Sequence, residues 1–167
     1  MTRPFLSVVM PVHRALGVLG ESVAALLASD LPRSDWELII VDDSSGDDTP
    51  EMAARYADRI VRVTGGARGP AYARNRGVEV GRGEVVMFVD ADVCVHGPTL
   101  SRIAAAFRDD TGLAAVFGSY DADPRAPGFV SQFRNLLHHH VHQCNRGPAE
   151  TFWAGCGAVR RSALLEV

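Results

Sequence analysis

The sequence predicts an α/β fold in which a mainly parallel sheet is flanked by helices, within one domain covering residues 1–167. Short apolar segments rich in β-branched residues alternate along the chain with segments whose apolar side chains recur at helical spacing. The predicted strands are apolar on both faces, which is typical of a parallel sheet buried between two layers of helices. A length of 167 residues also suits one domain rather than two.

The first half of the chain alternates strands with helices. Thr49 is predicted to cap the second helix, because Pro50 follows it at the first helical position. In order, we expect a strand at 6–12, a helix over about 16–27, a strand at 36–41, a helix starting at 49, a strand at 60–63, a helix at 71–80 and a strand at 84–89.

The second half is predicted to complete the same domain. We expect a helix at 99–107, a strand at 113–120, a polar loop containing proline, a helix over about 129–143, an extended segment at 152–159 and the start of a helix near 162.

Composition and charge exclude several classes of protein. An apolar content of 47% and a net charge of -3 give no general electrostatic reason to bind nucleic acid. Cys94, Cys144 and Cys156 form no Cys-x-x-Cys pair, which favours a reducing compartment over a zinc site or a disulfide framework. The N-terminus is a poor match to a signal peptide, because one basic residue precedes a short apolar run and no small-residue cleavage site follows it. No apolar run approaches the roughly 20 residues of a membrane span. We therefore expect a cytoplasmic protein, or one at the inner face of the membrane.

Three polar segments follow the second, third and fourth predicted strands, at 42–48, 65–70 and 90–92. In an open parallel sheet, ligands bind at the carboxyl ends of the strands, so these segments are expected to meet. Asp90 and Asp92 lie two residues apart on an extended segment, and a divalent cation would neutralise their repulsion. Magnesium or manganese prefers such oxygen ligands and commonly shares them with substrate phosphates. Taken singly, each segment is also compatible with a solvated turn or a helix cap.

With these segments in this order, the sequence resembles the family 2 glycosyltransferases, which have the Rossmann-like GT-A fold. The matching segments are SVVMPV at 7–12, IVDDSS at 40–45, GPAYARNRG at 69–77, the D-x-D segment FVDAD at 88–92, and WAGCGAVRR at 153–161. The resemblance implies a transferase that moves a hexosyl-type sugar from a UDP- or GDP-sugar to an acceptor hydroxyl with inversion, assisted by Mn²⁺ or Mg²⁺. The acceptor would be a saccharide, a lipid carrier or a small molecule.

The resemblance also assigns residues to roles. On the donor side, Pro11 and Val12 would line the nucleotide pocket, Asp43 would accept a hydrogen bond from the base, and Asp42 would support that loop. Arg68 and Arg74 would face the nucleotide or the diphosphate. Asp90 would lie near the ribose and the metal, and Asp92 would bind the metal directly. On the acceptor side the residues are Trp153, Gly155 and Cys156.

The general base of the family is expected in a Glu-Asp segment beyond Val167, where this chain stops. We therefore expect the chain to be the N-terminal part of a longer transferase, and the alternative is a nucleotide-sugar-binding domain that does not catalyse transfer. A haloacid-dehalogenase-type phosphatase also ends a strand with D-x-D, but that family normally uses the first strand. An NAD-dependent oxidoreductase is disfavoured, because residues 11–17 lack the G-x-G-x-x-G turn.

Two further features leave alternatives open. His138 and His142 would share one face of a helix, either as metal ligands or as a polar face near the acceptor. Trp153 is expected in the core or the wall of a pocket, with sugar stacking as the alternative.

Overall fold

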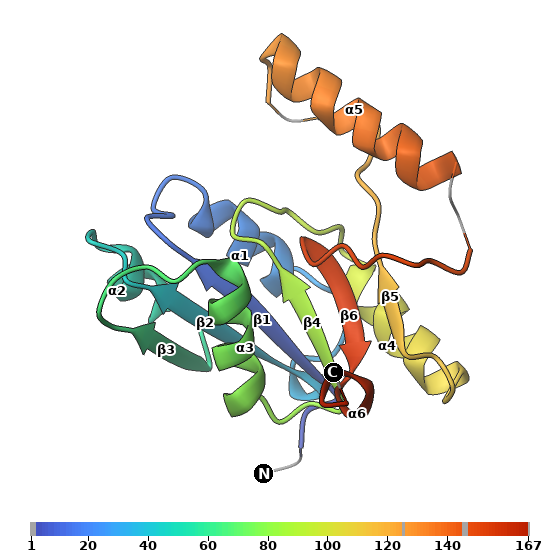
Figure 1. The fold of residues 1–167 in the computed structure, drawn as a ribbon, viewed down its shortest axis with the longest axis horizontal. Coiled ribbons are helices and arrows are strands. Elements are labelled where there is room, and N and C mark those ends of the chain that lie inside the picture. The colour runs from blue at the N-terminus through green and yellow to red at the C-terminus, as the bar shows by residue number, and fades with distance from the viewer. Residues whose placement is uncertain (1–2, 125, 145–146, 167) are drawn as a thin grey trace.

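The computed structural model describes residues 3–124, 126–144 and 147–166. Its centre is a six-stranded sheet with the order β3-β2-β1-β4-β6-β5 (Figure 1). The elements in chain order are β1 (Leu6–Val12), α1 (Leu19–Leu27), the short 3-10 helix η1 (Arg33–Asp35), β2 (Trp36–Asp43), α2 (Thr49–Ala53), β3 (Arg59–Val63), α3 (Pro70–Val80), β4 (Val85–Val89), α4 (Thr99–Asp109), β5 (Ala115–Phe117), α5 (Phe129–Cys144), β6 (Cys156–Arg160) and α6 (Arg161–Leu164).

The sheet is mainly parallel, as predicted. Strand β1 pairs in parallel with β2 and β4, and β2 pairs in parallel with β3. Strand β6 runs antiparallel to both β4 and β5. Because of this reversal, β6 begins at the edge of the sheet where the parallel strands β1 to β4 end.

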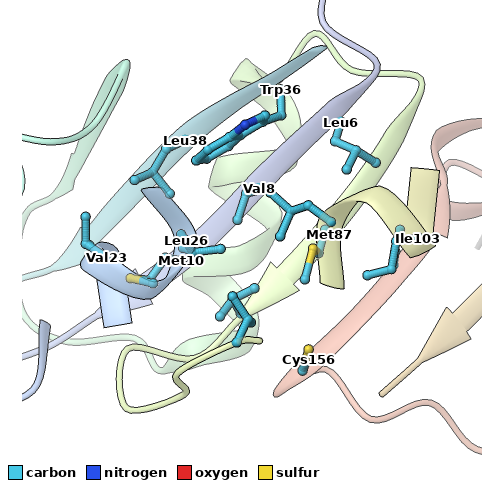
Figure 2. Close-up of a cluster of buried hydrophobic side chains, with 14 of the residues drawn as sticks. Leu6, Val8, Met10, Val23, Leu26, Trp36, Leu38, Met87, Ile103 and Cys156 are labelled. Carbon is cyan, nitrogen blue, oxygen red and sulfur yellow. The ribbon is translucent and has the colours of Figure 1, made fainter. Parts of the chain in front are cut away.

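Two apolar layers enclose the sheet. Val8 and Met10 of β1 point into the larger layer, which α1, α2 and α4 cover, and Figure 2 shows part of this layer. Val9 of the same strand points to the opposite face, where α3 packs. This alternation follows from the two-residue period of a strand, and it explains why β1, β2 and β4 are apolar on both faces.

Helix α3 approaches the sheet closely because residue 77 is glycine. A Cβ atom on Gly77 would lie 2.3 Å from Cγ1 of Val9, which is fully buried in β1. The chain enters this helix through Gly69, whose φ of 91° lies in the left-handed region that favours glycine, and Pro70 takes the first helical turn. Gly77 therefore sets how closely α3, the helix that carries Arg74, packs on the sheet, and Gly69 sets where this helix begins.

Several boundaries differ from the prediction. Residue Asp48, rather than Thr49, is the N-cap of α2, and its side chain makes no capping hydrogen bond. The backbone N–H of Thr49 donates to Oδ1 of Asp47 at 3.1 Å. The hydroxyl of Thr49 instead accepts a hydrogen bond from the backbone N–H of Ala15 at 2.9 Å, which ties the second loop to the first. Strands β5 and β6 are shorter than the predicted segments 113–120 and 152–159, since much of each segment forms loops around the sheet edge. Among the described residues, no helix combines the length and the apolar character needed to cross a bilayer.

Candidate functional site

The carboxyl edge of the sheet gathers the predicted site segments. Loops follow β1, β2, β3 and β4 there, because these four strands are parallel. The antiparallel β6 starts at the same edge, with Cys156 paired to Val89. The backbone N–H of Asp90 donates to the carbonyl of Gly155 at 3.0 Å. The D-x-D segment and the predicted acceptor-side segment therefore lie side by side.

Asp43 holds the loop before α3. Asp43 is the last residue of β2, and it is only 4% exposed. The carboxylate accepts hydrogen bonds from the backbone N–H of Arg68 at 2.9 and 3.0 Å, and from that of Gly69 at 2.7 Å. Three of the roughly four lone-pair sites of this carboxylate are thus used within the chain. The remaining site is on Oδ1, which accepts one hydrogen bond where Oδ2 accepts two.

The first and second loops are joined by further hydrogen bonds. Asp42 is buried, and its Oδ1 accepts from the backbone N–H of Ser45 at 3.3 Å. His13 Nδ1–H donates to the carbonyl of Asp43 at 2.7 Å. Sequence reasoning missed His13, since it belongs to none of the recognised segments. Of the two residues predicted to line the nucleotide pocket, Pro11 is half-buried, whereas the side chain of Val12 packs in the core.

Arg74 and Asp90 form an ion pair between the third loop and the D-x-D segment. Arg74 Nη2 lies 2.5 Å from Asp90 Oδ1, and the side chains are 17% and 38% exposed. The Nε atom of Arg74 is buried and has no hydrogen-bond partner among the described residues. A buried donor without a partner is unfavourable, so this N–H is suited to an acceptor atom of a ligand. Arg68, the other arginine predicted at the donor side, instead lies over the ring of Tyr72, with its guanidinium carbon 4.9 Å from the ring centre.

The carboxylates of Asp90 and Asp92 act on a common neighbour, Tyr120. Burial raises the pKa of the Tyr120 phenol, and the negative charges of Asp92 and then Asp90 raise it further. Both carboxylates therefore lie within electrostatic range of one hydroxyl, with Asp92 exposed at the surface. No group of three or more His, Cys, Asp or Glu residues suited to a metal ion occurs in the described part of the chain. A cation at Asp90 and Asp92 would therefore need further oxygen ligands from a substrate or from water.

Aromatic side chains form a wall beside these carboxylates. The ring centre of Tyr120 lies 4.8 Å from that of Trp153 and 5.2 Å from that of His138. His142 adds a contact of 5.4 Å to Trp153. The indole fits against the backbone because residue 155 is glycine, since a Cβ atom on Gly155 would lie 2.6 Å from the indole ring. The structure thus places the two histidines on a face of α5 that meets rings.

Cys156 contributes packing rather than reactivity. Burial, followed by the nearby charge of Asp90, raises the pKa of the Cys156 thiol to about 11. The group is therefore a neutral thiol near pH 7 and a poor nucleophile or base. Its backbone carbonyl accepts from the N–H of Gly118 at 2.8 Å, which joins the loop after β5 to the start of β6.

A cavity of about 330 Å³ lies at the opposite edge of the sheet, lined by Arg3, Glu84, Arg160, Arg161, Ser162 and Leu165. None of the predicted site residues lines it. The candidate site is the surface formed by loops at the carboxyl edge, where the charged side chains converge.

Comparison with known proteins gives consistent matches. The family model described as Glycosyl transferase family 2 matches residues 7–167. The poly(ribitol-phosphate) beta-N-acetylglucosaminyltransferase TarS of Staphylococcus aureus is 31% identical over 108 residues, which are 62% of this chain and 19% of TarS.

Two solved structures share the fold. The mannosyltransferase PcManGT of Pyrobaculum calidifontis, in complex with GDP-Man and Mn²⁺, has a TM-score of 0.72 and 25% identity over 99% of this chain and 47% of that protein. Residues 1–349 of TarS, in complex with UDP-GlcNAc, have a TM-score of 0.73 and 23% identity over 96% of this chain and 46% of theirs. The chain thus spans about a fifth of TarS and just under half of each of these two solved chains.

Proposed function

The chain belongs to glycosyltransferase family 2, and from this membership we propose that its sheet edge binds a nucleotide-diphosphate sugar for transfer, with inversion, to an acceptor hydroxyl. One observation carries the proposal. Arg74 is ion-paired with Asp90, its buried Nε–H has no partner among the described residues, and the exposed Asp92 follows two residues after Asp90. This combination provides one cationic donor for a diphosphate and one anionic ligand for a cation.

For the nucleotide, we propose a position across the ends of β1, β2 and β3. Pro11 is half-buried there, and Asp42 supports the loop after β2 through its hydrogen bond to Ser45. The free lone-pair site on Asp43 Oδ1 suits a ring N–H of uracil or guanine. Arg68 is available for the diphosphate from the same loop. Both nucleotides have precedents in relatives, since PcManGT is bound to GDP-Man and TarS to UDP-GlcNAc.

For the metal, we propose that Asp92 and Asp90 hold Mn²⁺ or Mg²⁺ together with oxygens of the diphosphate. The donor set fits, because such ions accept one or two carboxylates and complete their coordination with phosphates and water. When bound, the ion would supply positive charge that stabilises the leaving diphosphate. Arg74 acts in the same direction, since its guanidinium is held beside the D-x-D segment by Asp90 and is ready for developing negative charge.

For the sugar and the acceptor, we propose the surface formed by Trp153, Gly155 and Cys156, bounded by Tyr120. The neutral Cys156 thiol cannot act as the base there, because its pKa is raised to about 11. We assign the general base to no described residue. Donor binding is therefore the step that the residues of this sheet edge perform, and it can be tested without transfer.

The test is calorimetry with UDP and with GDP, each with and without Mn²⁺, on the wild type and on Asp92→Asn. We expect one nucleotide to bind in a metal-dependent way, and we expect the substitution to weaken that binding at least about tenfold, since one of two protein ligands loses its charge. Asp109→Asn is the matched control, because Asp109 is exposed at the end of α4. Equal affinities of wild type and Asp92→Asn in the presence of Mn²⁺ would show that the metal role is wrong.

A further inference from the structure

The order of the strands along the carboxyl edge gives a nucleotide-diphosphate sugar a direction. The strands follow one another as β3, β2, β1, β4, β6 and β5 (Figure 1). In the function proposed above, the nucleotide lies across the ends of β1, β2 and β3, and the diphosphate lies beside Asp90 and Asp92 after β4. The three parts of such a donor are linked in the order nucleotide, diphosphate, sugar. The sugar would therefore lie over the neighbouring ends of β6 and β5.

The loop that follows β5 is fastened to this part of the edge. The backbone N–H of Gly118 donates to the carbonyl of Cys156, at the start of β6, at 2.8 Å. His96, which follows the D-x-D segment, places its Nε2 3.1 Å from Oδ2 of Asp121. Contacts with β6 and with the loop after β4 thus hold the chain on both sides of Tyr120.

The ring of Tyr120 is held by its neighbours, which leaves its hydroxyl for a ligand. The ring of His138 stacks on it with centres 5.2 Å apart, and the ring of Trp153 lies 4.8 Å away. Within the described part of the chain, the hydrogen bonds of Tyr120 go to its backbone carbonyl, from Ser119 Oγ–H at 2.8 Å and from His139 Nδ1–H at 2.6 Å. The phenolic hydroxyl has no hydrogen-bond partner in that part of the chain.

This hydroxyl suits a sugar. It keeps its proton near pH 7, because burial, and then the charges of Asp92 and Asp90, raise the pKa of the Tyr120 phenol. A neutral phenol donates one hydrogen bond and can also accept, and a hydroxyl group of a sugar offers the same pair of functions. Both carboxylates act on this hydroxyl, which is therefore on the side of the site where a sugar attached to the diphosphate would lie.

We propose that Tyr120 is a specificity-determining residue for the donor sugar, and that its hydroxyl donates a hydrogen bond to a hydroxyl oxygen of a hexose held over β6 and β5. This role rests on the proposed function, because the positions of the nucleotide and the diphosphate come from it. Tyr120 contacts the sugar through its hydroxyl, whereas His138 and Trp153 hold its ring in place. Removing the hydroxyl should therefore weaken binding of the sugar and leave binding of the nucleotide unchanged.

The test is calorimetry in the presence of Mn²⁺ with UDP and GDP and with three nucleotide sugars, UDP-glucose, UDP-GlcNAc and GDP-Man. Tyr120→Phe keeps the ring and its packing and removes only the hydroxyl. We expect this variant to bind the nucleoside diphosphate as wild type does, and to bind the preferred nucleotide sugar about three- to tenfold more weakly, which is the effect of one hydrogen bond between neutral groups. The matched control is Tyr56→Phe, the same change at an exposed tyrosine that follows α2, and it should match wild type with every ligand.

Three results would overturn the role of Tyr120 and leave nucleotide binding in place. The first is equal affinity of wild type and Tyr120→Phe for the nucleotide sugar. The second is an equal loss of affinity for nucleotide and nucleotide sugar, because the hydroxyl would then act on the diphosphate or on the fold. The third is wild type that binds a nucleotide but none of the three nucleotide sugars. Wild type that binds no nucleotide would instead refute the proposed function, and the role of Tyr120 with it.

Discussion

Replacing Asp43 by asparagine tests how the second and third loops are joined. The carboxylate accepts three hydrogen bonds from two backbone N–H groups at a position that is 4% exposed. Asparagine keeps one oxygen, but its NH₂ group then faces the N–H of Arg68 or Gly69. A hydrogen bond to a charged group stabilises the folded state by about 1.5–3 kcal/mol, and leaving a buried donor without a partner destabilises it by a similar amount. We expect the free energy of unfolding to fall by about 2 kcal/mol.

The measurement is urea unfolding followed by circular dichroism. With a slope near 2 kcal/mol per molar urea, the midpoint should fall by about 1 M. Asp48→Asn makes the same chemical change at an exposed position of the same loop, and its midpoint should stay close to that of wild type, within about 0.5 kcal/mol of stability. In the calorimetric assay, Asp43→Asn should also weaken nucleotide binding, because the loop that carries Arg68 loses its anchor. If Asp43→Asn and wild type share one midpoint, the carboxylate does not support the loop and the reasoning is wrong.

Three further predictions follow from packing and protonation. Gly77→Ala should lower the urea midpoint, because the new Cβ would lie 2.3 Å from the buried side chain of Val9. Such overpacking costs about 1–3 kcal/mol, which is more than the gain in helix propensity. Gly20→Ala is the control and should keep the wild-type midpoint, because its Cβ would meet only the flexible end of Met52 at 3.1 Å; equal midpoints of the two variants would refute the clash at Gly77. In iodoacetamide labelling at pH 8, followed by mass spectrometry, the exposed Cys144 should react first. Cys156 should react far more slowly, since a thiol with a pKa of about 11 is only about 0.1% thiolate, and similar rates would contradict its burial. Burial, and then the charges of His138 and His139, lower the pKa of His142 below 6.5 in the folded protein. The unfolded chain therefore binds this proton more readily than the folded chain does. The free energy of unfolding should fall as the pH drops below about 6.5. His142→Asn should reduce that loss in urea titrations at several pH values, and an unchanged pH dependence would count against it.

The family and the fold class could be predicted from the sequence, and both are confirmed. The apolar run of β4 followed by Asp90 and Asp92 indicates a buried strand ending at a ligand-binding edge, and the segment 69–77 predicts the loop and helix that follow β3. These predictions succeed because alternating periodicity, glycine and proline positions act locally along the chain. The expected roles of the individual site residues stay predictions that calorimetry can decide.

Other features could not be predicted, since they depend on which segments meet. No local pattern shows that β6 is antiparallel, yet this direction brings Gly155 to the backbone of Asp90. Tyr120 was predicted only as the end of a strand, and its role beside the carboxylates depends on a loop that the sequence does not orient. The exposed Phe129, Phe133 and Leu137 of α5 lie in a segment that was predicted as a helix, and periodicity cannot tell which side of a helix faces the fold.

The sequence by itself determined which segments form strands and helices and which strand ends carry charge, because those properties follow from short-range periodicity and turn chemistry. The tertiary structure decided how the charges are used. It pairs Arg74 with Asp90, which lies 16 residues further along the sequence. It also brings the Asp43 carboxylate to the backbone N–H groups of Arg68 and Gly69, which lie 25 and 26 residues further along. Such contacts depend on the order and direction of strands in the sheet, and these are set by the packing of the whole core.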